Sequence, residues 1–195
     1  MSKEIFAVTR AVLAEDLLQA ATTEATMLWR DREYLPECIS VKPGQTIDES
    51  PFINAKIDKK DQAFYAKETP AILELLKELA VTDTAIANVD MQPVMPRSMT
   101  INYCFAGTKV IPHRDVGDGR DNVSRIATLC SKGLFRVLDQ EAEPFIEPTI
   151  VTPGDFHELF NPRVRLKRRL HEASTIGDET RISIGFQVPV IRFSS

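Results

Sequence analysis

The sequence predicts a mainly β fold with helices at its N-terminal end. From Thr84 onward, short apolar stretches alternate with turns that contain Gly, Pro and Asp, as in "SMTINYCF", "SRIATLC", "LFRVLD" and "RISIGFQVPVIRF". Many short strands at this spacing are typical of a β-sandwich or barrel. Before Thr84, two segments repeat apolar residues at helical spacing instead. With 195 residues, the chain has the size of one domain with a substantial core.

The first 84 residues are expected to support this β core. Apolar residues recur at helical spacing from about Val8 to Arg30, which predicts one amphipathic helix. "PAILELLKELA" predicts a second helix, with Thr69 as its cap and Pro70 at its first position. The charged, proline-containing stretch from Val41 to Gln62 is a candidate lid. We therefore expect one domain, with a helical support and lid region over 1–84 and the β core over 85–195.

Composition limits the classes of partner and compartment. The net charge is −4 and the isoelectric point is near 5.5, which disfavours non-specific binding to nucleic acid. Cys38, Cys104 and Cys130 form no Cys-x-x-Cys pair and indicate reduced thiols in a cytoplasmic protein. The sequence shows no signal peptide and no apolar run of membrane-spanning length, so we expect no membrane association.

One of the three histidines lies two residues before a carboxylate, in His113-Arg114-Asp115. In an extended strand, residues i and i+2 point to the same face, so His113 and Asp115 would project together. An imidazole and a carboxylate side by side can fill two positions around a metal ion. A salt-bridged histidine on a surface strand would give the same pattern, so the triplet alone does not establish a metal site.

The other two histidines are the candidates for a third ligand. His157 lies in "GDFHELF" and His171 in "RRLHEAS", which precedes the last β segment. Two histidines and one carboxylate on one face of an iron ion, with the remaining positions open, form the centre of non-haem Fe(II) oxygenases.

The last β segment contains a second unusual feature, an arginine expected on an inner strand face. Arg181 and Ser183 share one face of "RISIGFQV", and Ile182, Ile184 and Phe186 share the other. An arginine inside a β core is costly unless it meets an anion. A guanidinium binds a carboxylate through two hydrogen bonds, and the serine hydroxyl adds a donor. This pair therefore predicts a bound dicarboxylate.

The order His113-x-Asp115, His171, Arg181-x-Ser183 resembles the Fe(II)/2-oxoglutarate-dependent oxygenases, over roughly residues 97–192. The resemblance implies a double-stranded β-helix core, of the jelly-roll or cupin-like type. It implies that His113, Asp115 and His171 bind Fe(II), and that Arg181 and Ser183 hold the distal carboxylate of the co-substrate 2-oxoglutarate, with O₂ as oxidant. The family spacing favours His171 over His157, which lies too far from Arg181.

"INYCFAGTKVIPHRD" is further similar to the AlkB-type branch of this superfamily. There an Asn lies eleven residues before the first metal histidine, as Asn102 does here, and a Tyr two residues later also assists 2-oxoglutarate binding. This chain has Cys104 at that second position, and Tyr103 lies one residue early. The branch usually ends with Arg-x-Asn and a second Arg six residues after the first, where this chain has Ser183 and Gln187. These departures weaken a transfer of nucleic-acid specificity.

The resulting expectation is an iron- and 2-oxoglutarate-dependent dioxygenase that hydroxylates a small molecule, such as an amino acid or a derivative. The alternatives are an AlkB-like nucleic-acid demethylase, a protein hydroxylase, and a non-catalytic metal-binding β-barrel module. A basic run before His171, which comprises Arg163, Arg165, Lys167, Arg168 and Arg169, is either a solvated edge or a site for an anionic substrate.

Overall fold

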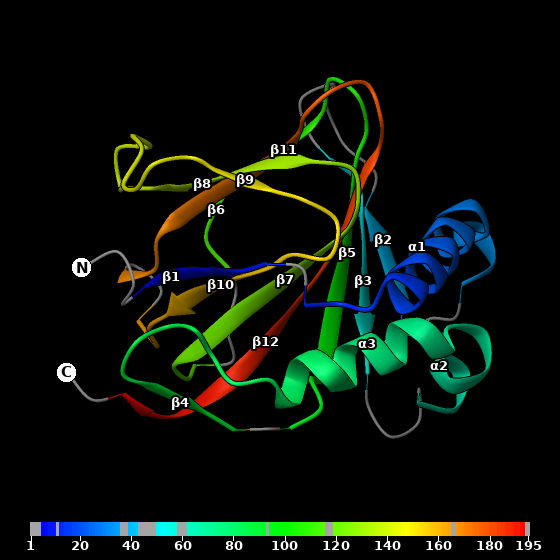
Figure 1. Ribbon diagram of the computed structural model, residues 1–195, viewed down its shortest axis with the longest axis horizontal. Coiled ribbons are helices and arrows are strands. Elements are labelled where there is room, and N and C mark those ends of the chain that lie inside the picture. Colours follow the sequence, from blue (N-terminus) through cyan, green and yellow to red (C-terminus); the bar gives the residue numbers. More distant parts are fainter. Residues whose placement is uncertain are drawn as a thin grey trace.

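A computed structural model describes residues 5–10, 12–35, 39–42, 50–57, 62–92, 94–115, 119–164 and 167–193. These residues form two antiparallel sheets and a small number of helices (Figure 1). The predicted mainly β fold with N-terminal helices is confirmed. No helix among the described residues is long and apolar enough to cross a membrane.

Four helices of the described residues precede the main run of strands: α1 (Glu15–Arg30), the 3₁₀ helix η2 (Arg32–Tyr34), α2 (Gln62–Glu68) and α3 (Pro70–Val81). The larger sheet has the order β1 (Phe6–Thr9), β10 (Phe156–Asn161), β7 (Asn122–Cys130), β12 (Arg181–Phe193), β5 (Ser98–Cys104), β3 (Phe52–Lys56) and β2 (Ile39–Lys42), and β4 (Val89–Met91) pairs with β12. The smaller sheet has the order β6 (Lys109–His113), β11 (Leu170–Thr175), β8 (Gly133–Leu138) and β9 (Thr149–Val151).

The helices cover the outer face of the larger sheet (Figure 1). On β12, the alternate residues Ile182, Ile184 and Phe186 are buried against this helical layer. Burial of each such side chain contributes roughly 1.5–3 kcal/mol. Arg181 and Ser183 point the other way, toward the cavity between the sheets. The strand therefore separates an apolar outer face from a polar inner face, as the alternation predicts.

The N-terminal third differs from the prediction in two respects. The first helix begins at Glu15 and not at Val8, because Phe6–Thr9 forms β1 and pairs with β10. The strands β1, β2 and β3 also come from the first 84 residues, so the large sheet extends beyond the predicted β core. Within the predicted lid, residues 43–49 and 58–61 lie outside the described residues, and Phe52–Lys56 is strand β3.

The helix α3 begins at Pro70 as predicted, but a different residue caps it. Both carboxylate oxygens of Glu24, on α1, accept hydrogen bonds from α3, one from the Ala71 amide at 2.9 Å and one from the Ile72 amide at 2.8 Å. The hydroxyl of Thr69 instead donates to the Tyr65 carbonyl at 3.4 Å. A carboxylate at a helix N-terminus also meets the positive end of the helix dipole. Glu24 therefore joins the two helices of the outer layer.

A second polar link joins the helical layer to the sheet. Arg125 on β7 and Glu158 on β10 form a fully buried ion pair, with Arg125 Nη2 at 2.8 Å from Glu158 Oε1. Arg125 also donates to the Leu79 carbonyl of α3, and Glu158 accepts from the Ala85 amide at 2.8 Å. These bonds pair both buried charges, so the ion pair fixes α3 against the sheet.

Replacing Glu24 with Gln should lower the free energy of unfolding by about 1–2 kcal/mol, because the charge and one acceptor at the α3 N-terminus are lost. Urea denaturation followed by circular dichroism measures this change. Glu33→Gln, at an exposed position of η2, is the matched control and should leave the midpoint unchanged. Equal stability of the two variants would contradict the assigned cap.

Candidate metal centre

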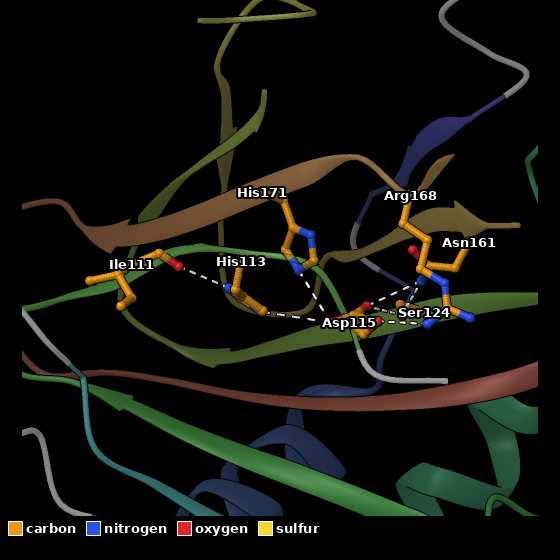
Figure 2. Close-up of polar contacts among 7 residues, drawn as sticks. All are labelled: Ile111, His113, Asp115, Ser124, Asn161, Arg168 and His171. Atoms are coloured by element: carbon orange, nitrogen blue, oxygen red, sulfur yellow. Dashed lines mark hydrogen bonds and ion pairs between the residues drawn. The ribbon is translucent and has the colours of Figure 1, made fainter. Parts of the chain in front are cut away.

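The structure brings the side chains of His113, Asp115 and His171 to one point (Figure 2). His113, at the end of β6, lies directly opposite His171 on β11. Asp115 Oδ1 is 3.6 Å from His113 Nε2 and 3.4 Å from His171 Nε2. The three potential ligand atoms lie within 4.8 Å of one another. The antiparallel pairing of β6 with β11 places the two histidines side by side, and Asp115 meets them from just beyond the end of β6.

The hydrogen bonds of His113 and Asp115 orient their ligand atoms. His113 Nδ1 is 2.9 Å from the Ile111 carbonyl, which can only accept, so Nδ1 carries the proton and Nε2 keeps its lone pair. Burial raises the pKa of Asp115, but the nearby imidazoles of His171 and His113 and the hydrogen bond from Ser124 outweigh it. The pKa of Asp115 therefore lies well below its usual value, and the group is a carboxylate.

Three residues hold Asp115 from the side opposite the histidines (Figure 2). Its second oxygen, Oδ2, accepts hydrogen bonds from Ser124 Oγ and from Asn161 Nδ2, the latter at 3.1 Å. Asn161 Nδ2 also lies 2.7 Å from Ser124 Oγ. Arg168 Nη1 donates to the Asp115 backbone carbonyl at 2.6 Å. We call Ser124, Asn161 and Arg168 the Asp115 clamp, because together they leave Oδ1 directed at the histidines.

This donor set fits a divalent transition metal. Two imidazole nitrogens and one carboxylate oxygen on one side leave other coordination positions for small ligands. Outer partners that fix a ligand are a regular feature of metal sites in proteins, and here the Ile111 carbonyl fixes His113 and the Asp115 clamp fixes Asp115. The residues present therefore fit a metal ion bound by three protein side chains.

The centre opens into a cavity of about 690 Å³ that is lined from both sheets. One wall comes from the small sheet and carries the two histidines with Val110, Phe135 and Ala173. The other wall comes from the inner face of the large sheet. A volume of this size accommodates small-molecule ligands.

At the same cavity lies Arg181, which is 1% exposed. Its Nη2 donates to Thr128 Oγ1 at 3.2 Å, and no carboxylate among the described residues forms an ion pair with it. Nε has no hydrogen-bond partner in the described part of the chain. Burial lowers the pKa of Arg181, partly offset by the Cys104 and Cys130 thiols, but an arginine stays protonated at neutral pH. A buried, incompletely satisfied cation fits an anionic ligand.

Gly133 leaves the space that this guanidinium occupies. A Cβ at position 133 would lie 2.3 Å from Arg181 Nε, so no larger residue fits there without displacing the arginine.

Of the other residues predicted to bind the co-substrate, two line the cavity and one does not. Ser183 and Asn102 lie opposite each other on β12 and β5 and face the cavity. Tyr103 points to the outer face, where its hydroxyl donates to the Ala25 carbonyl at 2.8 Å and its ring lies 4.8 Å from that of Trp29. This placement corrects the expectation for Tyr103, because alternate residues of a strand face opposite sides.

His157, the rival third ligand, also lines the cavity but does not belong to the group around Asp115. Its ring lies 4.0 Å from that of Phe135. Burial, followed by the charges of Arg181 and His171, holds the pKa of His157 well below its usual value, so the ring is neutral.

The basic run before His171 divides into different environments. Arg168 is buried in the Asp115 clamp, and the Arg169 guanidinium lies 3.7 Å from the centre of the Phe145 ring. Arg163 and Lys167 are exposed, and Arg165 lies outside the described residues. Two residues of the run, Arg168 and Arg169, therefore make contacts within the fold.

The Asp115 clamp was not predicted from the sequence. Asn161 lies four residues after His157 on β10, so a polar residue at an inward strand position was the available signal. Arg168 carried no such signal, because it belongs to a run of charges typical of a surface.

Searches by sequence found no family model and no curated protein that matches. Three solved structures share the fold over most of their length. A prolyl-4-hydroxylase from Pseudomonas putida has 15% identity and a TM-score of 0.55, with 95% of this chain and 93% of that chain covered. A prolyl hydroxylase from Trichoplax adhaerens, in complex with a hypoxia-inducible-factor peptide fragment, has 11% identity and a TM-score of 0.56, with 95% and 84% covered. AviO1 from Streptomyces viridochromogenes has 16% identity and a TM-score of 0.54, with 98% and 92% covered.

Proposed function

We propose that this protein is an Fe(II)/2-oxoglutarate-dependent dioxygenase that hydroxylates a small molecule, such as an amino acid or a derivative. The observation that carries the proposal is the pairing of two features in one cavity. These are the convergence of His113, Asp115 and His171, and the buried Arg181, which has no carboxylate partner among the described residues. Likeness in fold to proteins named as prolyl hydroxylases supports the hydroxylase class.

The same proposal extends to the architecture. Two antiparallel sheets that enclose a ligand cavity, with the metal ligands on the smaller sheet, are consistent with a double-stranded β-helix of the jelly-roll type. The free thiols of Cys104 and Cys130 support a reducing, cytoplasmic location.

The roles of the residues follow from their contacts. His113, Asp115 and His171 would hold Fe(II), with the Asp115 clamp keeping the carboxylate on one oxygen. Arg181, Ser183 and Asn102 would hold the distal carboxylate of 2-oxoglutarate. When bound, Fe(II) with 2-oxoglutarate and O₂ supplies the oxidising chemistry, in which 2-oxoglutarate becomes succinate and CO₂ and one oxygen atom enters a substrate C–H bond. Phe135 and Ile126 add apolar side chains to the lining of the cavity that contains both groups.

The rest of the cavity supports a small, polar substrate. On β3, β5 and β12, its lining includes neutral groups able to form hydrogen bonds, Asn54, Ser98, Thr100 and Gln187, beside the apolar Phe52 and Phe186. The engagement of Arg168 and Arg169 in the fold leaves fewer basic side chains for a nucleic-acid backbone than the sequence suggested.

A screen for succinate release with Fe(II), O₂ and 2-oxoglutarate tests the proposal. It should cover amino acids, nucleosides, methylated oligonucleotides and peptides. Stimulation by amino acids or related compounds is the expected result. Stimulation only by methylated DNA or RNA, in a salt-dependent manner, would favour the AlkB-like alternative, which the cavity position of Asn102 supports. Stimulation only by peptides would favour a protein hydroxylase. If no compound caused turnover of 2-oxoglutarate, the remaining alternative would be a non-catalytic metal-binding module.

His171→Ala should weaken Mn²⁺ binding by more than roughly 100-fold, because loss of even an outer partner of a ligand typically costs roughly 10–100-fold. Mn²⁺ serves as the stable probe for Fe²⁺, and calorimetry measures the affinity. His157→Ala is the matched control, since the third histidine lies outside the ligand group, and it should keep the affinity of the wild type. The reverse result would assign the ligand to His157.

Arg181→Met should raise the dissociation constant of 2-oxoglutarate for the Mn²⁺-loaded protein by about 10–100-fold, the value of a buried hydrogen-bonded charge pair. Mn²⁺ affinity should not change. Gly133→Ala should act in the same direction, because the added methyl group occupies the place of the guanidinium. Unchanged 2-oxoglutarate binding in both variants would refute a role for Arg181 in anion binding.

Arg168→Met should weaken Mn²⁺ binding by about 10-fold, because the Asp115 backbone loses the bond that positions it. Lys167→Met removes the neighbouring charge at an exposed position and should have no effect. Equal losses in the two variants would point to a general effect of charge in place of the clamp.

A further inference from the structure

His157 is a buried polar side chain whose hydrogen-bonding capacity is unused within the fold. It is fully buried, and neither ring nitrogen has a hydrogen-bond partner among the described residues. Buried polar side chains nearly always have a partner, in the protein, in water or in a ligand. The partner of His157 must therefore come from outside the described side chains.

The side chains that pack against the His157 ring are apolar. The Phe135 ring lies 4.0 Å away and the Phe6 ring 6.2 Å away, and Ile126 is the residue opposite His157 on β7. None of these side chains can donate or accept a conventional hydrogen bond. His157 does line the cavity, so the contents of the cavity are the available partner.

The position of His157 within the cavity points to the end at which Arg181 lies. His157 lies opposite Ile126 on β7, two residues from Thr128, whose Oγ1 accepts a hydrogen bond from Arg181 Nη2. The Phe135 ring, 4.0 Å from that of His157, lies two residues along β8 from Gly133, which leaves the space for the Arg181 guanidinium. Because the imidazole is neutral, it offers one N–H donor and one acceptor. An anion on Arg181 would accept from that donor.

Resting on the proposed function, we infer that His157 donates a hydrogen bond to the 2-oxoglutarate carboxylate that pairs with Arg181. Arg181, on β12, supplies the charge, and His157, on β10 two strands away in the same sheet, supplies a second, uncharged donor. Such a donor orients the bound carboxylate without adding a second buried charge, which would be costly. His157 is thus a positioning residue for the co-substrate and not a ligand of the metal.

Two substitutions separate this role from simple packing. His157→Leu keeps the apolar contacts with Phe135 and removes the donor, whereas His157→Gln keeps a donor. In the Mn²⁺-loaded protein, we expect His157→Leu to raise the dissociation constant of 2-oxoglutarate about 10-fold. We expect His157→Gln to bind within about 3-fold of the wild type, and both variants to keep wild-type Mn²⁺ affinity. The metal-free Leu variant should melt at or above the wild-type temperature, because an unsatisfied buried polar group is gone.

A spectroscopic readout on the unmodified protein complements the variants. In Zn²⁺-loaded protein with ¹⁵N-labelled histidine rings, 2-oxoglutarate should shift one ring N–H proton downfield and slow its exchange. The spectrum of His157→Gln assigns that signal. A signal change confined to His113 and His171 would overturn the inference.

The outcomes distinguish this inference from the proposed function itself. If wild-type protein with Mn²⁺ binds no 2-oxoglutarate, the proposed function fails. If the wild type binds and His157→Leu binds within twofold of it, the function stands and the role of His157 is refuted, with a buried water as the remaining partner. Loss of Mn²⁺ affinity in both His157 variants would also refute it, because the residue would then act through the metal site.

Discussion

The position of one carboxylate, that of Asp115, determines the geometry of the candidate centre. Its Oδ1 faces both histidines, and its Oδ2 is held by Ser124 and Asn161. These holding groups come from β7 and β10 of the large sheet, whereas the histidines belong to the small sheet. A carboxylate that is bonded on both sides joins the two sheets at the metal centre. The pairing of β10 with β7 is therefore as important to the centre as the ligands themselves.

Arg181 imposes a second constraint. A buried guanidinium needs acceptors, and the described residues supply only a hydroxyl and thiols. The fold nevertheless provides space for it by placing a glycine at position 133. Because this buried cation lacks some of its hydrogen-bond acceptors, an anion that supplies them would bind with a favourable free energy. The same reasoning applies to His157, with a neutral donor in place of a charge.

The features that could be predicted from the sequence were those that depend on residues close together in the chain. The alternation of Arg181 and Ser183 with Ile182 and Ile184 depends only on the geometry of one strand. Asp115 lies two residues beyond the end of β6, so its nearness to His113 follows from their short separation in the chain. The start of α1 was misplaced, because Val8 continues the apolar pattern although its backbone pairs with β10. The α3 cap was assigned to Thr69 because the true cap, Glu24, is 47 residues away from Ala71. Asn161 and Arg168 were missed for the same reason, since they reach Asp115 across 46 and 53 residues.

The division of the cavity between the two sheets has a consequence for ligand selection. The histidines belong to the small sheet, and Arg181 belongs to β12 of the large one. Phe6, on β1, and Phe135, on β8, stack at 5.4 Å and act as a spacer between the layers. On the proposed chemistry, the two ends of the co-substrate would be held by different sheets. The packing between the sheets, which includes this aromatic stack, would therefore set the length of keto diacid that the site accepts.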